Sequence, residues 1–276
     1  MGENRIKLVA ADMDGTLLNR ERKITKYTQN VIKKAMAQGV YFVPATGRAV
    51  NALPPELKEM EGIRYGIFSN GATIYDLKEE KVIYKNHFEM DRVLELMKFL
   101  KQFDLMESIS LNGQSYANKK EMENIDYYEL DSNTKAIVQG SRVLVDDLEM
   151  FVKEQSTTVE KTTLLFKTME ERRRAADALS KIEDIQFSSS LPKNLEISKK
   201  GCNKDGLFHL AKILNIQKEE IMSCGDADND RELLESAGLA VVMENGLDSM
   251  KAIADYITVS NQENGVAKAM EKFVLR

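Results

Sequence analysis

The sequence predicts an α/β fold, in which a parallel sheet covered by helices on both faces is interrupted by one inserted α+β domain. At both ends of the 276-residue chain, short apolar runs alternate with amphipathic helical patterns. This alternation is typical of strand–helix–strand units around a parallel sheet. Between about residues 86 and 192 it gives way to a mixed pattern. We therefore expect a core domain of residues 1–85 and 193–276, and an inserted domain of residues 86–192.

The first part of the core is expected to run strand, helix, strand, helix, strand and then a hairpin. Thr25 is a suitable cap for the first helix and Gly39 a suitable stop. In chain order, the expected elements are the strand IKLVAA (6–11), a helix over 25–38, the strand VYFVPA (40–45), a helix over 50–60, the strand YGIFS (65–69) and a hairpin over 72–84.

The insert is expected to mix helices with paired strands, after which the core pattern resumes. An Asn-Gly pair at Asn112 predicts a tight turn between two of the strands. The other expected elements of the insert are helices over 89–103, near 147 and over 170–181, with strands at 162–166 and near 187. The second part of the core is expected to contain the strands NLEIS (194–198), EIMSCG (220–225), LAVVM (239–243) and YITVS (256–260), with helices over 204–214, 230–237, 247–254 and 265–272.

The composition is that of a soluble globular protein, with 43% hydrophobic and 30% charged residues. A net charge of −5 makes non-specific nucleic-acid binding an unlikely function. No apolar stretch is long enough to span a membrane, and the N-terminus has no signal-peptide pattern. With only two cysteines, Cys202 and Cys224, we expect a cytoplasmic location. The oligomeric state is not predicted.

Two aspartates, Asp12 and Asp14, follow the first predicted strand, and Gly15 comes directly after them. Side chains at positions i and i+2 of a strand point to the same side, unless the chain has already turned. Ligands of an open parallel sheet bind beyond the carboxyl ends of its strands, so both acids lie where a ligand is expected. Gly15 permits a sharp turn and leaves its backbone N–H open to an anion. Asp-Gly-Thr is also a good turn sequence, and that explanation requires no ligand.

Polar groups also follow other predicted strands. Thr46 and Gly47 offer a hydroxyl and backbone N–H groups at a helix start, where anions are commonly held. Lys204 begins a helix, where its charge opposes the helix dipole and is better explained by a bound anion. Asn70 ends the third strand, where it either contacts a substrate or forms an Asn-Gly turn.

A second acidic group lies in SCGDADND, residues 223–230. Asp226 ends the strand, Asp230 follows one helical turn later, and Asn229 lies beside it. Some of these residues also suit a helix cap. Because crowded carboxylates are costly without a cation, Asp226 together with Asp12 and Asp14 predicts a bound metal. Oxygen-only ligands indicate Mg²⁺.

These motifs, in this order, resemble the haloacid dehalogenase-like (HAD) superfamily of phosphohydrolases, and within it the Cof-type phosphatases with a class II cap. The resemblance covers the whole chain, including SNGATIYD (69–76) and ADYITVSNQENGVAKAMEK (254–272). It implies a Rossmann-like parallel-sheet core. It also implies that the insert is a cap domain, which closes over the site and selects substrates.

The same resemblance implies a role for each motif. Asp12 is the expected nucleophile, and Asp14 the general acid and base. Mg²⁺ is expected on Asp226, on the carboxylate of Asp12 and on the backbone carbonyl of Asp14, with Asn229 close to the metal. The resemblance implies that Thr46 and Lys204 hold the phosphate, with Asn229 close to it. Together with the residues chosen above for their place at strand ends, the residues expected to hold the phosphate or the substrate are Gly15, Thr46, Gly47, Asn70, Lys204 and Asn229.

This set predicts Mg²⁺-dependent hydrolysis of small phosphate monoesters, such as sugar phosphates, through an aspartyl-phosphate on Asp12. A carboxylate approaching a phosphate is repelled by about 4 kcal/mol for each pair of unit charges at about 4 Å, if the effective dielectric is near 20. Mg²⁺ and Lys204 would supply the cancelling charge. Two other functions fit the same residues: a phosphomutase of the same superfamily, and a non-catalytic metabolite-sensing protein. The sequence distinguishes neither the phosphorylated substrate nor the cap residues that contact it.

Overall fold

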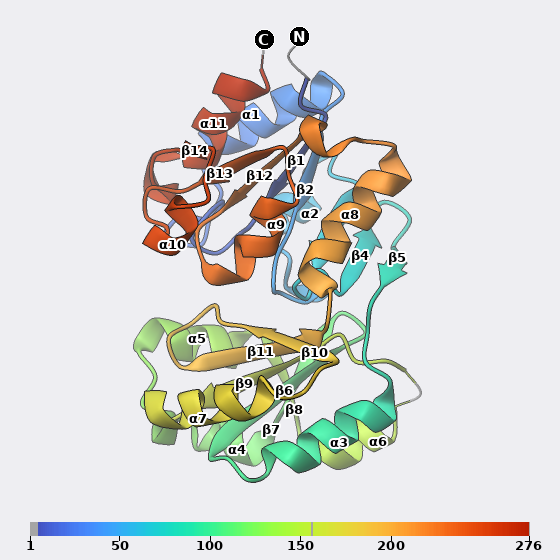
Figure 1. Ribbon diagram of the computed structural model, residues 1–276, viewed down its shortest axis with the longest axis vertical. Coiled ribbons are helices and arrows are strands. Elements are labelled where there is room, and N and C mark those ends of the chain that lie inside the picture. The colour runs from blue at the N-terminus through green and yellow to red at the C-terminus, as the bar shows by residue number, and fades with distance from the viewer. Residues whose placement is uncertain (1–4, 156, 276) are drawn as a thin grey trace. The chain divides into compact units, whose positions relative to one another are not determined.

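The computed structural model describes residues 5–155 and 157–275, without the side chains of residues 133 and 203–205. The chain forms two compact units (Figure 1). The first, the core unit, comprises Met1–Arg48, Leu53–Tyr84 and Asn203–Arg276. The second, the insert unit, comprises Ala49–Ala52 and Lys85–Cys202.

The core unit is built on a sheet of five parallel strands, which confirms the predicted α/β fold class. The strand β1 lies inside this sheet, and all four of its side chains are buried. In spatial order the strands are β14 (Tyr256–Ile257), β13 (Leu239–Val242), β12 (Ile221–Gly225), β1 (Leu8–Ala11) and β2 (Tyr41–Pro44).

Helices cover both faces of this sheet. Leu8 and Ala10 pack in one apolar cluster with side chains of α8 (Cys202–Leu214) and α9 (Arg231–Glu235), which lie in front of the sheet in Figure 1. The alternate residues of β1 point to the opposite face. There α1 (Lys26–Ala37) contacts β2 and packs against α11 (Gly265–Phe273). The shorter helices of the core unit are α2 (Pro55–Lys58), α10 (Asp248–Lys251), η3 (Lys218–Glu220), η4 (Asp228–Asp230) and η5 (Asn261–Glu263).

The ends of α1 are those that the sequence predicts. The side chain of Thr25 accepts a hydrogen bond from the backbone N–H of Thr28, which caps the first turn. Gly39 has a φ of +85°, in the left-handed region that terminates helices. Local capping chemistry therefore sets both boundaries of this helix.

The predicted helix over residues 50–60 is wrong, because the chain forms two short pieces there. These are η1 (Val50–Ala52), which belongs to the insert unit, and α2 of the core unit. Pro54 and Pro55 lie at the start of α2. Proline has no backbone N–H and clashes with the preceding turn, so it begins a helix well and interrupts one in its interior.

The third predicted strand, β3 (Tyr65–Phe68), starts a second sheet of the core unit. It pairs antiparallel with β4 (Thr73–Asp76), which is followed by β5 (Lys81–Lys85), so the predicted hairpin is confirmed. One parallel bridge, from Ala45 to Ile67, connects β3 to the chain just after β2.

The insert unit contains a mixed six-stranded sheet. Its pairs are antiparallel except for β7 with β8. Asn112 and Gly113 connect β6 to β7 with φ values of 51° and 74°, the left-handed turn that the sequence predicts. In spatial order the strands are β10 (Ile185–Ser188), β11 (Asn194–Lys199), β9 (Lys161–Phe166), β6 (Leu105–Leu111), β7 (Gln114–Asn118) and β8 (Arg142–Val145).

The placement of NLEIS in the parallel core is wrong. It forms β11, which pairs antiparallel with both β9 and β10, so the insert unit continues past residue 192. Helices α3 (Met90–Leu100), α6 (Leu148–Lys153) and α7 (Met169–Leu179) pack together on one apolar face of the sheet. The remaining helices of this unit are α4 (Lys119–Glu123), η2 (Ile125–Tyr128) and α5 (Ser132–Gly140). Among the described residues, no helix has the length and apolar character needed to cross a membrane.

Candidate active site

Asp12 lies at the carboxyl edge of the core sheet. Its backbone N–H donates to the carbonyl of Cys224 at 3.0 Å, and its side chain is only 4% exposed. Ala11 is in register with Cys224, so the chain leaves β1 and β12 side by side. Asp12 and the acidic segment that follows Gly225 are therefore neighbours, as the position of strand ends in a parallel sheet requires.

Three carboxylates converge at this edge: Asp12, Asp226 and Asp230. Each offers an oxygen atom that lies within 4.8 Å of the others. Burial raises the pKa of Asp12 well above its usual value, and the nearby Asp230 and Asp226 raise it further. Burial likewise raises the pKa of Asp226 to about 6, and burial and the charge of Asp226 raise the pKa of Asp230. The cluster thus concentrates negative charge in a poorly solvated place, which a divalent cation would relieve.

Asp230 also organises the segment around it. Its Oδ2 accepts hydrogen bonds from the backbone N–H groups of Asp226, at 2.8 Å, and Ala227, at 3.1 Å. Its Oδ1 accepts one from Nδ2 of Asn229 at 3.1 Å. The amide oxygen of Asn229 is buried and has no hydrogen-bond partner among the described residues. A buried, unpaired oxygen beside three carboxylates is a suitable additional ligand for a hard cation.

The turn after β1 packs directly against Asp226. The hydroxyl of Thr16 donates to Oδ1 of Asp226 at 2.8 Å. Gly15 has a φ of +91°, and a Cβ atom at this position would lie 2.3 Å from Oδ2 of Asp226. The carbonyl of Gly15 accepts a hydrogen bond from Nδ2 of Asn245 at 2.9 Å. Gly15 is therefore required both for the predicted turn and for the close approach of a carboxylate.

Asp14 has a different environment from Asp12. Its side chain is 50% exposed, and both of its oxygens accept hydrogen bonds from Arg48. The distances are 2.8 Å from Nε to Oδ2 and 2.6 Å from Nη2 to Oδ1. The two aspartates therefore differ in both solvation and partners, which suits two distinct chemical roles.

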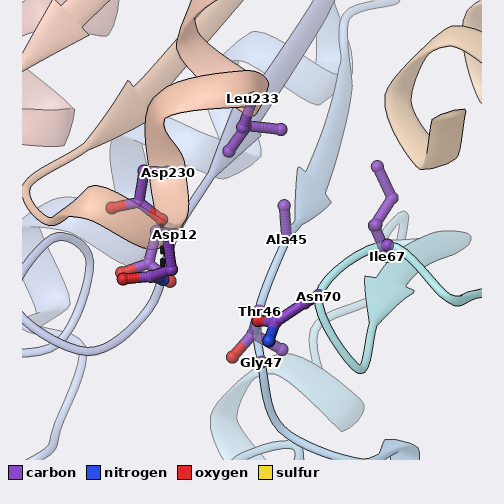
Figure 2. A pocket seen from close by; sticks show the side chains of 10 residues that line it. Asp12, Ala45, Thr46, Gly47, Ile67, Asn70, Asp230 and Leu233 are labelled. Carbon is purple, nitrogen blue, oxygen red and sulfur yellow. Dashed lines mark hydrogen bonds between the residues drawn. The ribbon is translucent and has the colours of Figure 1, made fainter. Parts of the chain in front are cut away.

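A cleft opens beside the buried carboxylates, and Thr46, Gly47 and Asn70 are among the residues that line it (Figure 2). The backbone N–H of Asn70 donates to the carbonyl of Thr46 at 3.1 Å. Ser69 and Asn70 have φ values of 52° and 57°, so Asn70 forms a left-handed turn as well as lining the cleft. The full lining is Asp12, Ala45, Thr46, Gly47, Ile67, Asn70, Gly71, Asn229, Asp230 and Leu233. The predicted phosphate ligand Lys204 belongs to α8, but its side chain lies outside the described part of the chain.

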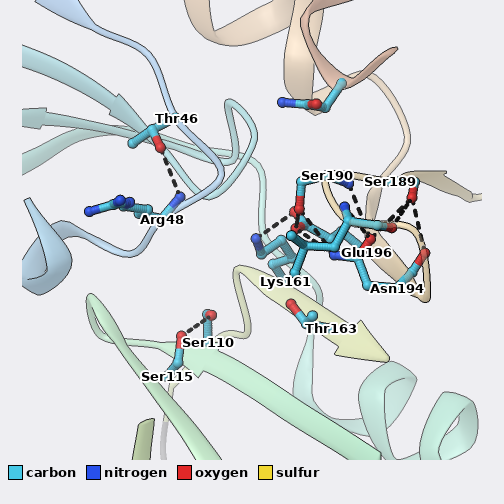
Figure 3. Close-up of polar contacts among 12 residues, drawn as sticks. Thr46, Arg48, Ser110, Ser115, Lys161, Thr163, Ser189, Ser190, Asn194 and Glu196 are labelled. Atoms are coloured by element: carbon cyan, nitrogen blue, oxygen red, sulfur yellow. Dashed lines mark hydrogen bonds and ion pairs between the residues drawn. The ribbon is translucent and has the colours of Figure 1, made fainter. Parts of the chain in front are cut away.

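The insert unit contains a polar cluster of its own, on one face of its sheet (Figure 3). Nζ of Lys161 lies 2.7 Å from Oε2 of Glu196, and both side chains are buried. Oε1 of Glu196 accepts from the hydroxyl of Ser190 at 2.5 Å and from Nδ2 of Asn194 at 3.2 Å. Charged groups are rarely buried unless they are paired, and here Lys161 and Glu196 pair with each other. This face of the sheet therefore differs from an apolar core.

Three residues around the acidic cluster carried no predicted role: Thr16, Arg48 and Asp230. The spacing of Asp226 and Asp230 signals that both acids lie on one face. Thr16 adjoins Gly15, and Arg48 adjoins Gly47, but sequence alone does not give their partners. Those partners depend on how the turns after β1 and β2 fold.

The chain matches the haloacid dehalogenase-like hydrolase family over residues 9–270. It is 30% identical over 275 residues to the Bacillus subtilis 5-amino-6-(5-phospho-D-ribitylamino)uracil phosphatase YcsE, which covers 98% of this chain and 96% of that protein. Among solved structures, a haloacid dehalogenase-like hydrolase from B. subtilis is 26% identical with a TM-score of 0.86, covering 98% of this chain and 100% of that one. A HAD subclass IIB sugar phosphatase is 25% identical with a TM-score of 0.79, covering 97% and 98%. Sequence and fold therefore agree along nearly the whole chain, which belongs to the haloacid dehalogenase-like hydrolase family.

Proposed function

We propose that this protein is a phosphatase that hydrolyses small phosphate monoesters with the help of Mg²⁺. The observation that carries the proposal is the convergence of Asp12, Asp226 and Asp230 beside a cleft lined by Thr46. The names of its relatives support a phosphatase activity. The cleft supplies a hydroxyl and backbone groups for an anion, while the acidic cluster supplies a nucleophile and a place for a cation.

The acidic cluster fits Mg²⁺. We assign Asp12 and Asp226 as carboxylate ligands, with the backbone carbonyl of Asp14 completing the predicted set. Asp230 and the unpaired amide oxygen of Asn229 lie beside them as further oxygen donors. All of these groups are hard oxygen ligands, which magnesium prefers. When bound, the ion supplies positive charge that lessens the repulsion between Asp12 and a phosphate.

The proposed reaction has two displacements at phosphorus. A carboxylate oxygen of Asp12 forms a bond to phosphorus while the bond to the leaving oxygen breaks, and that oxygen takes a proton from the carboxyl group of Asp14. Water then forms a bond to phosphorus and gives a proton to Asp14, while the bond between Asp12 and phosphorus breaks to release inorganic phosphate. The hydroxyl of Thr46, the backbone N–H of Gly47 and the charge of Lys204 would hold the phosphate oxygens.

The insert unit is proposed to be the cap that selects the substrate. We infer that this unit selects substrates by their leaving groups, as the resemblance to phosphatases with a class II cap implies. The phosphoribityl compound named for the relative is one candidate substrate.

The proposal is tested by measuring phosphate release from a panel of sugar phosphates, nucleotides and 5-amino-6-(5-phospho-D-ribitylamino)uracil, with Mg²⁺ or with a chelator. We expect release only with the metal. Asp12→Asn should lower kcat by about 10³-fold or more, as removal of a nucleophile generally does. Radiolabelled phosphate from the substrate should be trapped on the wild-type protein and not on this variant.

Asp228→Asn is the matched control, because Asp228 is an exposed acid of the same segment that is not a member of the cluster. Its activity should equal that of the wild type. No phosphate release from any compound would refute the proposal, as would full activity of Asp12→Asn. A product that is an isomer of the substrate, formed without free phosphate, would identify a phosphomutase instead.

A further inference from the structure

The side chain of Arg48 donates two hydrogen bonds to the carboxylate of Asp14. Nε and Nη2 of Arg48 donate to separate oxygens of Asp14, at 2.8 Å and 2.6 Å. Among the described residues, these are the hydrogen bonds that reach this carboxylate. Two parallel hydrogen bonds from a planar guanidinium fix both the position and the plane of a carboxyl group, which a single point charge does not do.

Asp14 needs such a restraint, because its own surroundings provide little. It lies on the turn after β1 and its side chain is half exposed. A backbone bridge to Leu18 holds its main chain but leaves its side-chain torsions free. A proton donor must lie within hydrogen-bond reach of the oxygen that it protonates, so a freely rotating carboxyl would be misplaced much of the time.

Arg48 is anchored well enough to provide the restraint. Its backbone N–H donates to the hydroxyl of Thr46 at 3.2 Å (Figure 3). Its carbonyl accepts from the N–H of Ser69 at 2.9 Å, within the left-handed turn that also holds the carbonyl of Thr46. The segment after β2 is thus tied to the turn after β3, and the guanidinium starts from a fixed backbone.

From this geometry we infer that Arg48 is a positioning residue, which orients the carboxyl group of Asp14 for proton transfer. The inference rests on the proposed function. In the first displacement, the bond from phosphorus to the leaving oxygen breaks and the proton of Asp14 passes to that oxygen. For this transfer, the oxygen that carries the proton must give up its hydrogen bond to Arg48 and turn to the leaving group, while the other oxygen keeps its hydrogen bond and holds the carboxyl group in place.

This role predicts that the importance of Arg48 depends on the leaving group. An alkoxide is a poor leaving group and requires the proton, whereas p-nitrophenolate leaves readily without one. The ratio kcat/KM includes only the steps up to departure of the leaving group, so it isolates this proton transfer from the later hydrolysis of the intermediate. We expect Arg48→Ala to lower kcat/KM at least tenfold more for an alkyl phosphate, such as glucose 6-phosphate, than for p-nitrophenyl phosphate.

Arg48→Lys keeps the charge but not the paired donors, and should recover only part of the loss. Thermal unfolding of each variant should match that of the wild type, since this ion pair is partly exposed. An equal loss for both substrates would overturn the inference, because a general defect in structure or phosphate binding does not depend on the leaving group.

A double-mutant cycle with Asp14→Asn distinguishes positioning from direct substrate binding. With the alkyl phosphate, at enzyme concentrations high enough for slow turnover to be measured, Arg48→Ala should lower kcat/KM less than threefold in the Asp14→Asn background. A loss there as large as in the wild type would show that Arg48 acts on the substrate itself, and would overturn the inference. If the wild type released no phosphate from either substrate, the proposed function would fail first.

Discussion

At the scale of single residues, Gly15 is the position where even a small side chain should be harmful. Gly15→Ala should disable the site, because the new methyl group would overlap the Asp226 carboxylate, 2.3 Å away, while the φ of +91° strains any L side chain. We expect a stability loss of about 1–3 kcal/mol from the strain. We also expect a fall in kcat of about 100-fold, the effect of displacing a catalytic group by about an ångström. Thermal unfolding and phosphate release would measure the two effects.

Gly39→Ala is the matched control for this substitution. Gly39 has a nearly equal φ of +85°, but a Cβ atom there would meet nothing within 4 Å. The control should therefore lose stability by a similar amount and keep full activity. If Gly15→Ala were as active as the control, the close contact with Asp226 would have no functional meaning.

The residues of the site differ in how far the sequence predicts them. Asp12 and Asp226 each follow an apolar run, and topology alone brings the ends of parallel strands to one edge. Two other contacts depend instead on turns that bring together segments far apart in sequence. They are the hydrogen bond from Thr16 to Asp226 and the paired hydrogen bonds from Arg48 to Asp14. No local pattern specifies such contacts, because the turn residues favour a bend without fixing what it touches.

At the scale of elements, the turn after β3 tests whether Asn70 has one role or two. Asn70→Gly removes the amide that lines the cleft but suits the left-handed backbone, where φ is 57°. We expect a loss of stability of about 1 kcal/mol, because Asn70 is buried, and a several-fold rise in KM. Asn215→Gly is the control, because Asn215 has a similar φ of 53° and does not line this cleft. Equal KM values for both variants would show that Asn70 serves only to form the turn and does not contact the substrate.

The elements also show where prediction from sequence fails. Thr25 and Gly39 define α1 because caps act within a few residues. Residues 50–60 keep a helical pattern of apolar side chains, yet Pro54 and Pro55 divide the helix, since the missing N–H groups outweigh the pattern. The sequence predicts a strand at β11 but assigns it to the parallel core sheet, whereas it pairs with β9 and β10 of the insert unit. Side-chain alternation says which face of a strand is buried, and nothing about which sheet it joins.

At the scale of the whole molecule, the acidic cluster links folding to pH and to metal. Asp12 has a raised pKa, and the pKa of Asp226 is raised to about 6, because burial disfavours their charged forms. In the unfolded chain an aspartate titrates near pKa 3.9. Between about pH 4 and pH 6 the folded protein therefore holds protons that the unfolded chain has lost. The contribution of this cluster to the free energy of unfolding of the metal-free protein should therefore decrease as pH rises through that window.

Magnesium should reverse this trend, because the proposed site would bind it through the deprotonated carboxylates of the folded state. At a concentration 100 times its Kd, it should add about 2.7 kcal/mol of stability. For a chain of this size that corresponds to a rise in Tm of roughly 5 °C. The rise should be largest at pH 8 and shrink as pH falls through about 6, where protons compete for Asp226. Calorimetry from pH 5 to pH 8, with and without Mg²⁺, would measure it.

Asp12→Asn removes one of the crowded charges, so this variant should have a higher Tm than the wild type in the absence of metal at pH 8. It should also lose most of the response to Mg²⁺, while Asp228→Asn should keep the wild-type behaviour. A metal-induced rise in Tm that Asp12→Asn leaves unchanged would place the ion elsewhere. In that case no cation would balance the charge of the acidic cluster. Its hydrogen bonds alone would stabilise it, such as the one that Thr16 donates to Asp226 and the one that Asp230 accepts from the backbone of Asp226.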